Sequence, residues 1–82
     1  MSAEQLNSVL VGRALAKIRK TKGMTQEVLS GLSDIGRTHL SAIERGDRKP
    51  TLETIYRIAN ALDISMVQIV AAIEEEIRNE DK

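Results

Sequence analysis

Apolar residues recur at helical spacing in five separate segments of this chain, and a glycine, a turn or a proline ends the first three. The first stripe consists of Val11, Ala14, Leu15 and Ile18, which lie three or four residues apart. No segment shows the strict alternation of apolar and polar residues that is typical of a half-buried strand. The 82-residue chain therefore predicts an all-α domain with five helices around one core.

Capping residues and helix breakers set the expected boundaries of the later helices. Thr25, Thr51 and Ser65 are good N-caps because their hydroxyls can accept a hydrogen bond from a first-turn amide. Gly46 ends the third segment, and Pro50 forbids its continuation. The apolar residues of these helices are Val28, Leu29 and Leu32 in the second, Leu40 and Ile43 in the third, Leu52, Ile55, Ile58, Ala59 and Leu62 in the fourth, and Met66, Val70, Ile73 and Ile77 in the fifth.

Composition excludes several classes of function. The chain has no cysteine, which rules out disulfides, thiol catalysis and thiolate zinc sites. His39 is the only histidine and has no carboxylate pair near it, so we expect neither a metal site nor a catalytic triad. Tyr56 is the only aromatic residue, too few for a platform that stacks single-stranded bases. We therefore expect a protein that is not an enzyme and needs no cofactor.

The chain has no apolar run long enough to cross a bilayer. Its first residues, MSAEQLNSVLVGR, lack the basic and then apolar order of a secretory signal. The sequence thus predicts a cytoplasmic protein without a membrane partner, in which residues 1–82 form one domain and the acidic end, about residues 79–82, frays. No ligand-sensing domain or small-molecule site is evident.

The net charge is zero, but the charges are unevenly distributed. Residues 1–50 hold nine Lys or Arg against five Asp or Glu, whereas residues 51–82 hold three against seven. Such a chain can present a basic face to phosphates and an acidic end to solvent. The alternative is an ordinary scatter of solvated charges.

The second and third helices are short and are joined by a turn at residues 33–36, which is the spacing of a helix-turn-helix. On a helical wheel, Leu40 and Ile43 face one side of the third helix, as does Gly36. The opposite, outward side is small, polar and rich in hydrogen-bond donors, and it is formed by Thr38, Ser41, Ala42 and Arg45 with Arg37 and His39 at its flanks. A helix that enters the major groove needs such a face; a plain solvated face is the alternative.

The run TQEVLSGLSDIGRTHLSAIERGDRKPTLETIYRIANAL resembles the Xre/Cro class of helix-turn-helix regulators, to which the lambdoid phage repressors belong. Within it, the pattern R-T-x-L-S-x-I-E-R-G-x-R at residues 37–48 resembles the controller proteins of restriction–modification systems, although Lys49 stands where many controllers have Asn. The resemblance implies a lambda-repressor-like fold and a dimer that regulates its own gene from a pseudo-palindromic operator in double-stranded DNA. RNA polymerase is a further candidate partner. Other Xre-type repressors of phage, antitoxin or housekeeping function remain an alternative.

Several residues are candidates for contact with DNA. Arg37 is the leading candidate for reading a base, because arginine is the commonest specific partner of guanine; a phosphate contact is its alternative. The resemblance implies that Gln26 contacts phosphate or braces the recognition helix; an exposed helix-forming residue is its alternative. The full set is Arg37, Thr38 and Arg48 for bases, and Thr25, Gln26, His39, Ser41, Arg45 and Lys49 for the DNA backbone.

Two further features concern the structure. Arg19 and Glu44 flank the core stripes of their helices, and the resemblance implies an ion pair between them. The fifth helix carries more apolar residues than one core contact needs, which predicts a dimer interface. That interface comprises Val67, Ile69, Val70 and Ile73. Burial of the extra residues by the first helix is the alternative.

The leading hypothesis is therefore a dimeric, sequence-specific regulator that binds DNA. A protein-interaction module that kept the fold without DNA binding is the second. An enzyme is the third, and no nucleophile–base pair or phosphate loop in the sequence supports it.

Overall fold

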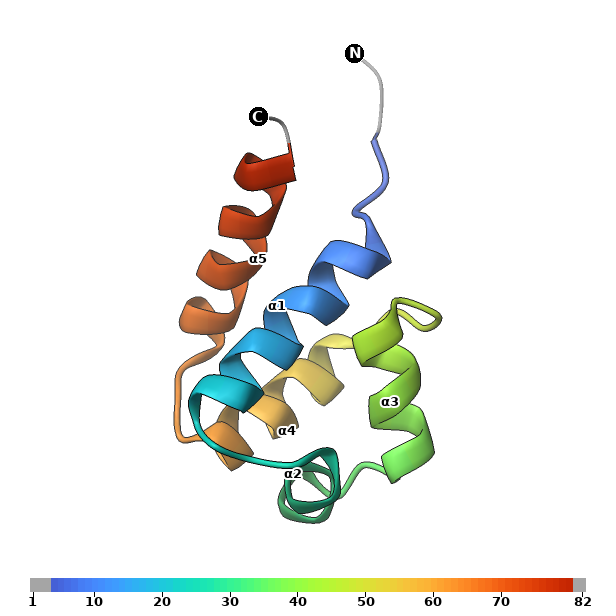
Figure 1. Cartoon of the computed structure of the whole chain (residues 1–82), viewed down its shortest axis with the longest axis vertical. Coiled ribbons are helices and arrows are strands. Elements are labelled where there is room, and N and C mark those ends of the chain that lie inside the picture. Colours follow the sequence, from blue (N-terminus) through green and yellow to red (C-terminus); the bar gives the residue numbers. More distant parts are fainter. Residues whose placement is uncertain (1–3, 81–82) are drawn as a thin grey trace.

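The computed structural model describes residues 4–80 and contains five helices and no strand within them. The helices are α1 (Ser8–Thr21), α2 (Gln26–Ser33), α3 (Arg37–Arg45), α4 (Leu52–Leu62) and α5 (Met66–Glu80). Helix α1 lies between α5 on one side and α3 on the other, while α2 packs against α3 and α4 (Figure 1). No single helix in residues 4–80 is long and apolar enough to span a membrane, and α4 and α5, which meet that requirement only as a pair, are bent by 106°.

The helix starts follow the capping residues expected from the sequence. The side chains of Thr25 and Thr51 accept hydrogen bonds from the third amide of α2 and α4, each at 3.1 Å. The Ser65 hydroxyl caps α5 by accepting a hydrogen bond from the Gln68 amide, and the Gln68 side chain accepts one from the Ser65 amide in return. The three predicted N-caps are thus confirmed, because this chemistry is local to the chain.

The core is aliphatic and is built mainly from α1, α3, α4 and α5. Its fully buried large side chains are Leu15, Leu29, Leu40, Ile43, Ile58, Leu62 and Ile69. Three residues of α2 and α4 expected to face the core are instead exposed: Val28, Leu32 and Leu52. Helix α2 is short and contributes only Leu29 to the large apolar core, since its outer side has no neighbouring helix.

The buried face of α5 differs from the expected one by one position. Ile69, Ile73 and Glu76 are buried, whereas Val70 points outward. The buried stripe includes the charged Glu76, which a pattern of apolar residues does not detect. The apolar pattern alone therefore placed the stripe on Val70. The described part of α5 continues to Glu80, and residues 81 and 82 of the end expected to fray lie outside the described residues.

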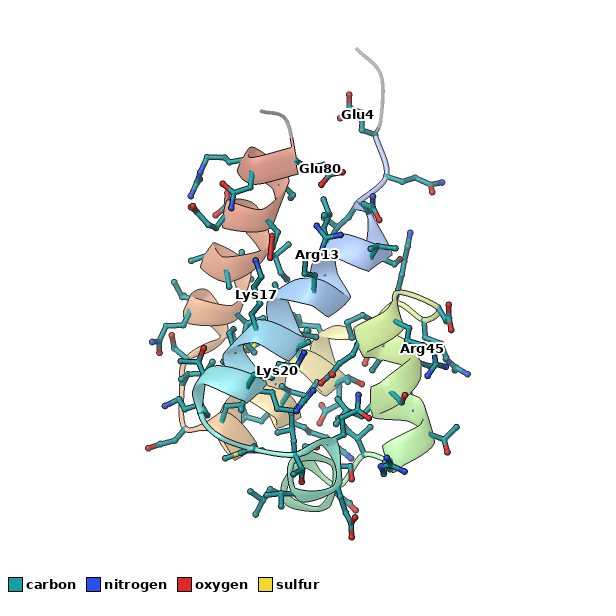
Figure 2. The ribbon with its side chains drawn as sticks, in the orientation of Figure 1. Glu4, Arg13, Lys17, Lys20, Arg45 and Glu80 are labelled. Carbon is teal, nitrogen blue, oxygen red and sulfur yellow. The ribbon has the colours of Figure 1, made fainter. Side chains whose placement is uncertain are left out.

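Ion pairs between α1 and α5 explain why Glu76 is buried. The Lys17 Nζ lies 2.5 Å from Glu76 Oε1. One helical turn away, the Arg13 nitrogen NH1 lies 3.6 Å from Glu80 Oε2 (Figure 2). The two pairs join the basic first half of the chain to its acidic end. Part of the charge asymmetry in the sequence therefore stabilises the packing of α5 on α1.

Helices α1 and α3 approach each other closely at Gly12. A Cβ added there would lie 2.5 Å from the carbonyl oxygen of Glu44 and closer still to that of Ile43. Both atoms are backbone atoms of α3 and cannot move aside as a flexible side chain can. Any larger residue at position 12 must therefore push α3 away from α1.

We expect Gly12→Ala to lower the free energy of unfolding by about 1–3 kcal/mol, the usual cost of overpacking. Gly31→Ala is the matched control, because nothing lies within 4 Å of an added Cβ there and alanine favours helix by about 0.5–1 kcal/mol. Urea denaturation should thus shift the two midpoints in opposite directions. A Gly12→Ala protein as stable as the wild type would contradict the close approach.

Candidate nucleic-acid interface

The turn between α2 and α3 sets the direction of α3. Asp34 ends α2 in the left-handed conformation, at φ 56°, and Ile35 then turns into the core. Leu40 and Ile43 are fully buried, as predicted, and fix the inner side of α3. Gly36 begins α3 without a side-chain cap.

The outward side of α3 gathers four of the predicted DNA-contacting residues. Arg37, Thr38, Ser41 and Arg45 line one shallow, open hollow of about 240 Å³. Arg37 and Thr38 are exposed, Ser41 is half-buried, and His39 is half-buried outside this group. Ala42, expected on the same outward side, is buried; because α3 contacts both α1 and α2, it has a wider buried arc than one stripe provides.

Arg45 is held by two neighbours at the end of α3. Its Nε donates to Asp47 Oδ2 at 3.0 Å, and its other guanidinium nitrogen, NH1, donates to Ser41 Oγ at 2.6 Å. Asp47 is not among the residues that the sequence predicts for the interface. The only sequence signal for it was a carboxylate two residues beyond an arginine, immediately after the helix-ending Gly46.

Five other cations in the described part of the chain are free of such bonds. Within residues 4–80, no hydrogen bond or ion pair joins the side chains of Arg37, Arg48 or Lys49 to another residue, and the same holds for Lys20 and Lys22. Arg48 and Lys49 are exposed in the loop that follows α3. The unpaired cations on α3 and this loop therefore remain available to an anionic partner.

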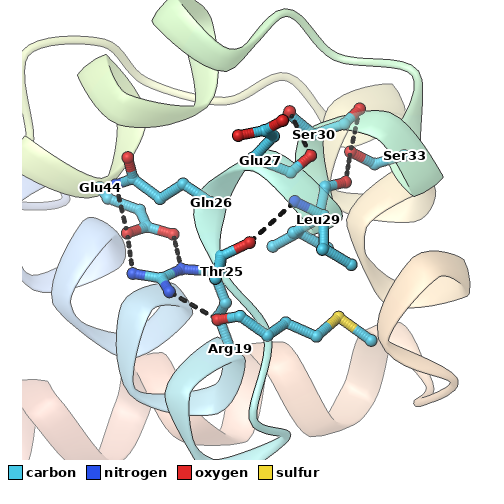
Figure 3. A network of polar contacts seen from close by, with 10 residues as sticks. Arg19, Thr25, Gln26, Glu27, Leu29, Ser30, Ser33 and Glu44 are labelled. Atoms are coloured by element: carbon cyan, nitrogen blue, oxygen red, sulfur yellow. Dashed lines mark hydrogen bonds and ion pairs between the residues drawn. The ribbon is translucent and has the colours of Figure 1, made fainter.

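A buried polar cluster fixes α3 against α1 and α2 (Figure 3). Arg19 donates from Nε and NH2 to the two carboxylate oxygens of Glu44, at 2.7 and 2.9 Å. Its remaining nitrogen donates to the carbonyl of Met24 at 2.7 Å, and Gln26 donates to Glu44 Oε1 at 2.9 Å. The predicted ion pair is thus present. Gln26 braces α3, which is one of the two roles that the resemblance implies for it.

The cluster also stabilises the charged form of Arg19. Its hydrogen bond to Glu44 raises the pKa of the guanidinium, burial opposes that change, and the charge of Glu44 adds to it. A raised pKa stabilises the fold at every pH below the ordinary arginine value, and the contribution is lost only as pH rises through the higher folded value. We therefore expect no loss of this contribution near neutral pH.

Thr25 and Gln26, both predicted to contact the DNA backbone, stand at the start of α2. The Thr25 hydroxyl is engaged in capping and the Gln26 amide in binding Glu44. The bond from Gln26 to Glu44 ties the start of α2 directly to α3. The structure thus brings Gln26 to the helix that carries Arg37 and Thr38.

The family model described as Helix-turn-helix (HTH_3) matches residues 15–69, which run from α1 into α5. The chain belongs to this family. Among its relatives, the uncharacterized HTH-type transcriptional regulator y4dJ of Sinorhizobium fredii is 42% identical over 66 residues, covering 80% of this chain and 86% of y4dJ. Control protein C.BamHI of Bacillus amyloliquefaciens is 40% identical over 57 residues, covering 68% of this chain and 70% of its own.

Solved structures of a controller protein share this fold. The restriction–modification controller C.Esp1396I superposes with a TM-score of 0.83 at 36% identity, covering 93% of this chain and 99% of its own. The same protein, as a tetramer in complex with its natural 35-base-pair operator, superposes with a TM-score of 0.81 at 36% identity, covering 90% and 97%. These matches confirm the predicted all-α, lambda-repressor-like fold and the Xre-type assignment. The helix-turn-helix chain is a transcriptional regulator related to restriction–modification controllers, and its relatives are regulators, not enzymes.

We expect Glu44→Gln to lower the free energy of unfolding by about 3–5 kcal/mol, because it leaves the buried Arg19 charge without its partner. The side chains of Arg19 and Glu44 are only 10% and 5% exposed. Glu53→Gln is the control, since it removes the carboxylate from the exposed pair with Arg57 and should cost at most about 0.5 kcal/mol. Equal midpoints for the two variants in urea denaturation would contradict the role of Glu44.

Proposed function

We propose that this protein is a sequence-specific regulator that binds duplex DNA with α3 in the major groove. The observation that carries the proposal is the outward side of α3, where small polar residues flank the unpaired Arg37. Small side chains allow a helix to approach the base edges, and one long donor can then reach them. The unpaired cations of the next loop supply the attraction to phosphates on which affinity depends.

The residues divide into two roles in this proposal. Arg37, Thr38 and Arg48 contact bases, and Arg37 pairs with a guanine. The backbone is contacted by Thr25, Gln26, His39, Ser41, Arg45 and Lys49. Because Thr25 and Gln26 use their side chains within the protein, we assign their DNA contact to the first amides of α2, which lie at the positive end of that helix.

The biological role that we propose is autoregulatory control of gene expression, with control of restriction–modification genes as its specific form. The similarity to C.BamHI and to C.Esp1396I, whose operator complex is known, supports it. A cytoplasmic location and a contact with RNA polymerase belong to the same proposal. The neighbouring genes test the specific form, because an adjacent endonuclease and methyltransferase are expected beside a controller.

Arg37→Ala should weaken binding to the preferred duplex by about 1–3 kcal/mol and relax the base preference at one position in each half-site. Selection from a pool of randomised duplexes first identifies the preferred sequence, and a salt-matched titration then compares the variants. Arg78→Ala is the control, since it removes the same charge from α5, on the far side of α1 from α3 (Figure 1).

Two outcomes would contradict the proposal in different ways. If Arg37→Ala retained both affinity and base preference, the assignment of Arg37 would be wrong. If the wild-type protein enriched no duplex at micromolar concentration, the DNA-binding function itself would be wrong, and the protein-interaction module would take its place.

The dimer that we propose uses only part of the surface expected. Ile69 is fully buried in the core and cannot form an exposed interface, whereas Ile73 is reached only from within a surface groove. Val67 and Val70 remain on the surface, at 75% and 49% exposure. Val70 lines one hollow with the exposed Leu6 and Leu52, and Leu52 lines a second with the exposed Tyr56. These four residues, Leu6, Leu52, Tyr56 and Val70, form an apolar patch.

A groove within this patch gives a partner somewhere to pack. It has a volume of about 240 Å³, and its sides are formed by Leu6, Leu52 and Val70. Ile55 and Ile73 of the core also line it. Exposed apolar patches rimmed by polar residues mark interaction surfaces, and a two-fold axis through this one would make each copy cover the other.

Val70→Lys should convert the dimer to a monomer and weaken operator binding, as measured by sedimentation and by the same titration. Val28→Lys is the matched control for the sedimentation measurement, because Val28 is also 49% exposed but lies on α2, outside the patch. A Val70→Lys protein that still sedimented as a dimer would place the interface elsewhere.

A further inference from the structure

The surface that carries Arg37 also carries a carboxylate, which is unexpected on a face that approaches phosphates. Asp47 lies two residues beyond Arg45, and its amide donates to the carbonyl of Ala42 at 2.9 Å. Gly46, at φ 85°, and this hydrogen bond close the end of α3. The backbone of Asp47 is therefore fixed, and its side chain is directed to Arg45 by the fold.

The contacts of Arg45 differ from those of the other cations on this face. Asp47 and Ser41 accept from Nε and NH1, at 3.0 and 2.6 Å. Arg45 is nevertheless 58% exposed and Asp47 62% exposed, so the pair lies in water. Exposed pairs of this kind contribute little to stability, about 0–1 kcal/mol. The carboxylate thus has a small structural value but a large effect on the local charge, because it cancels that of Arg45.

We infer that Asp47 is a positioning residue that competes with DNA phosphate for Arg45 and so restrains binding to DNA of any sequence. The inference rests on the proposed function. A phosphate can bind Arg45 Nε only if it displaces the Asp47 carboxylate from that nitrogen. The displaced carboxylate stays close by, so the positive charge of Arg45 is shared between the phosphate and Asp47. Arg37, which has no intramolecular partner among the described residues, carries no such penalty. The protein therefore keeps its base-reading arginine available while it restrains an arginine that can add affinity without specificity.

The test is a double-mutant cycle on a random-sequence duplex about three helical turns long, labelled with fluorescein. The four proteins are the wild type, Asp47→Asn, Arg45→Ala and the double variant, each titrated between about 50 and 200 mM salt. Glu75→Gln is the matched charge control, because it removes a carboxylate from an exposed pair with Arg78 on α5. Thermal melting of each protein checks that it is folded.

Asp47→Asn should tighten binding and steepen the slope of log K against log salt by up to about 0.9, the value of one complete phosphate contact, because Asp47 no longer shares the charge of Arg45. Its advantage over the wild type should therefore be up to about 3.5-fold larger at 50 mM than at 200 mM salt. In the Arg45→Ala background the same substitution should change neither affinity nor slope. Glu75→Gln should leave the slope unchanged.

Each other result overturns the inference. An equal gain with and without Arg45 means that Asp47 only repels phosphate, and a gain from Glu75→Gln means that net charge alone is responsible. Weaker or unchanged binding by Asp47→Asn means that the carboxylate does not withhold Arg45. If the wild type binds no duplex, both the proposed function and this inference fail. If the wild type binds DNA but the variants give one of the three results above, only the inference is rejected.

Discussion

The bidentate contact between Arg19 and Glu44 joins the three helices on which the candidate interface depends. It links α1 to α3, and through Gln26 and the carbonyl of Met24 it also holds the start of α2. A guanidinium has a fixed planar arrangement of donors, so it can satisfy a carboxylate and a carbonyl together only when the three helices lie in one arrangement. The direction of α3 is therefore determined by hydrogen-bond geometry as well as by apolar burial, which has no direction of its own.

The close contact at Gly12 complements this cluster. Without a side chain at position 12, the backbone of α1 can approach the end of α3, where Glu44 extends its carboxylate to Arg19. Apolar packing of Leu40 and Ile43 fixes the inner side of the same helix. The outward side is then free of structural demands, and this freedom allows it to carry the short polar residues that suit a DNA groove.

The distribution of ion pairs explains how a chain of zero net charge can still present a basic surface. The first fifty residues contain an excess of cations, but several are engaged within the fold: Arg13 and Lys17 with α5, Arg19 with Glu44, and Arg45 with Asp47. The cations left unpaired include Arg37, Arg48 and Lys49, on α3 and the loop that follows it. Net charge alone therefore says little about this protein, whereas the list of unpaired cations indicates where an anionic partner is attracted.

The sequence by itself determined the number and order of the helices, their caps at Thr25, Thr51 and Ser65, and the inward Leu40 and Ile43, because capping and helical periodicity involve residues close together in the chain. The grouping of Arg37, Thr38, Ser41 and Arg45 on one side of α3 followed from the same periodicity. Only the tertiary structure decided that Ile69, not Val70, faces the core, because the burial of Glu76 depends on Lys17 of another helix. It also decided which cations stay unpaired. A charge is neutralised by whatever the fold places beside it, and spacing along the chain does not contain that information.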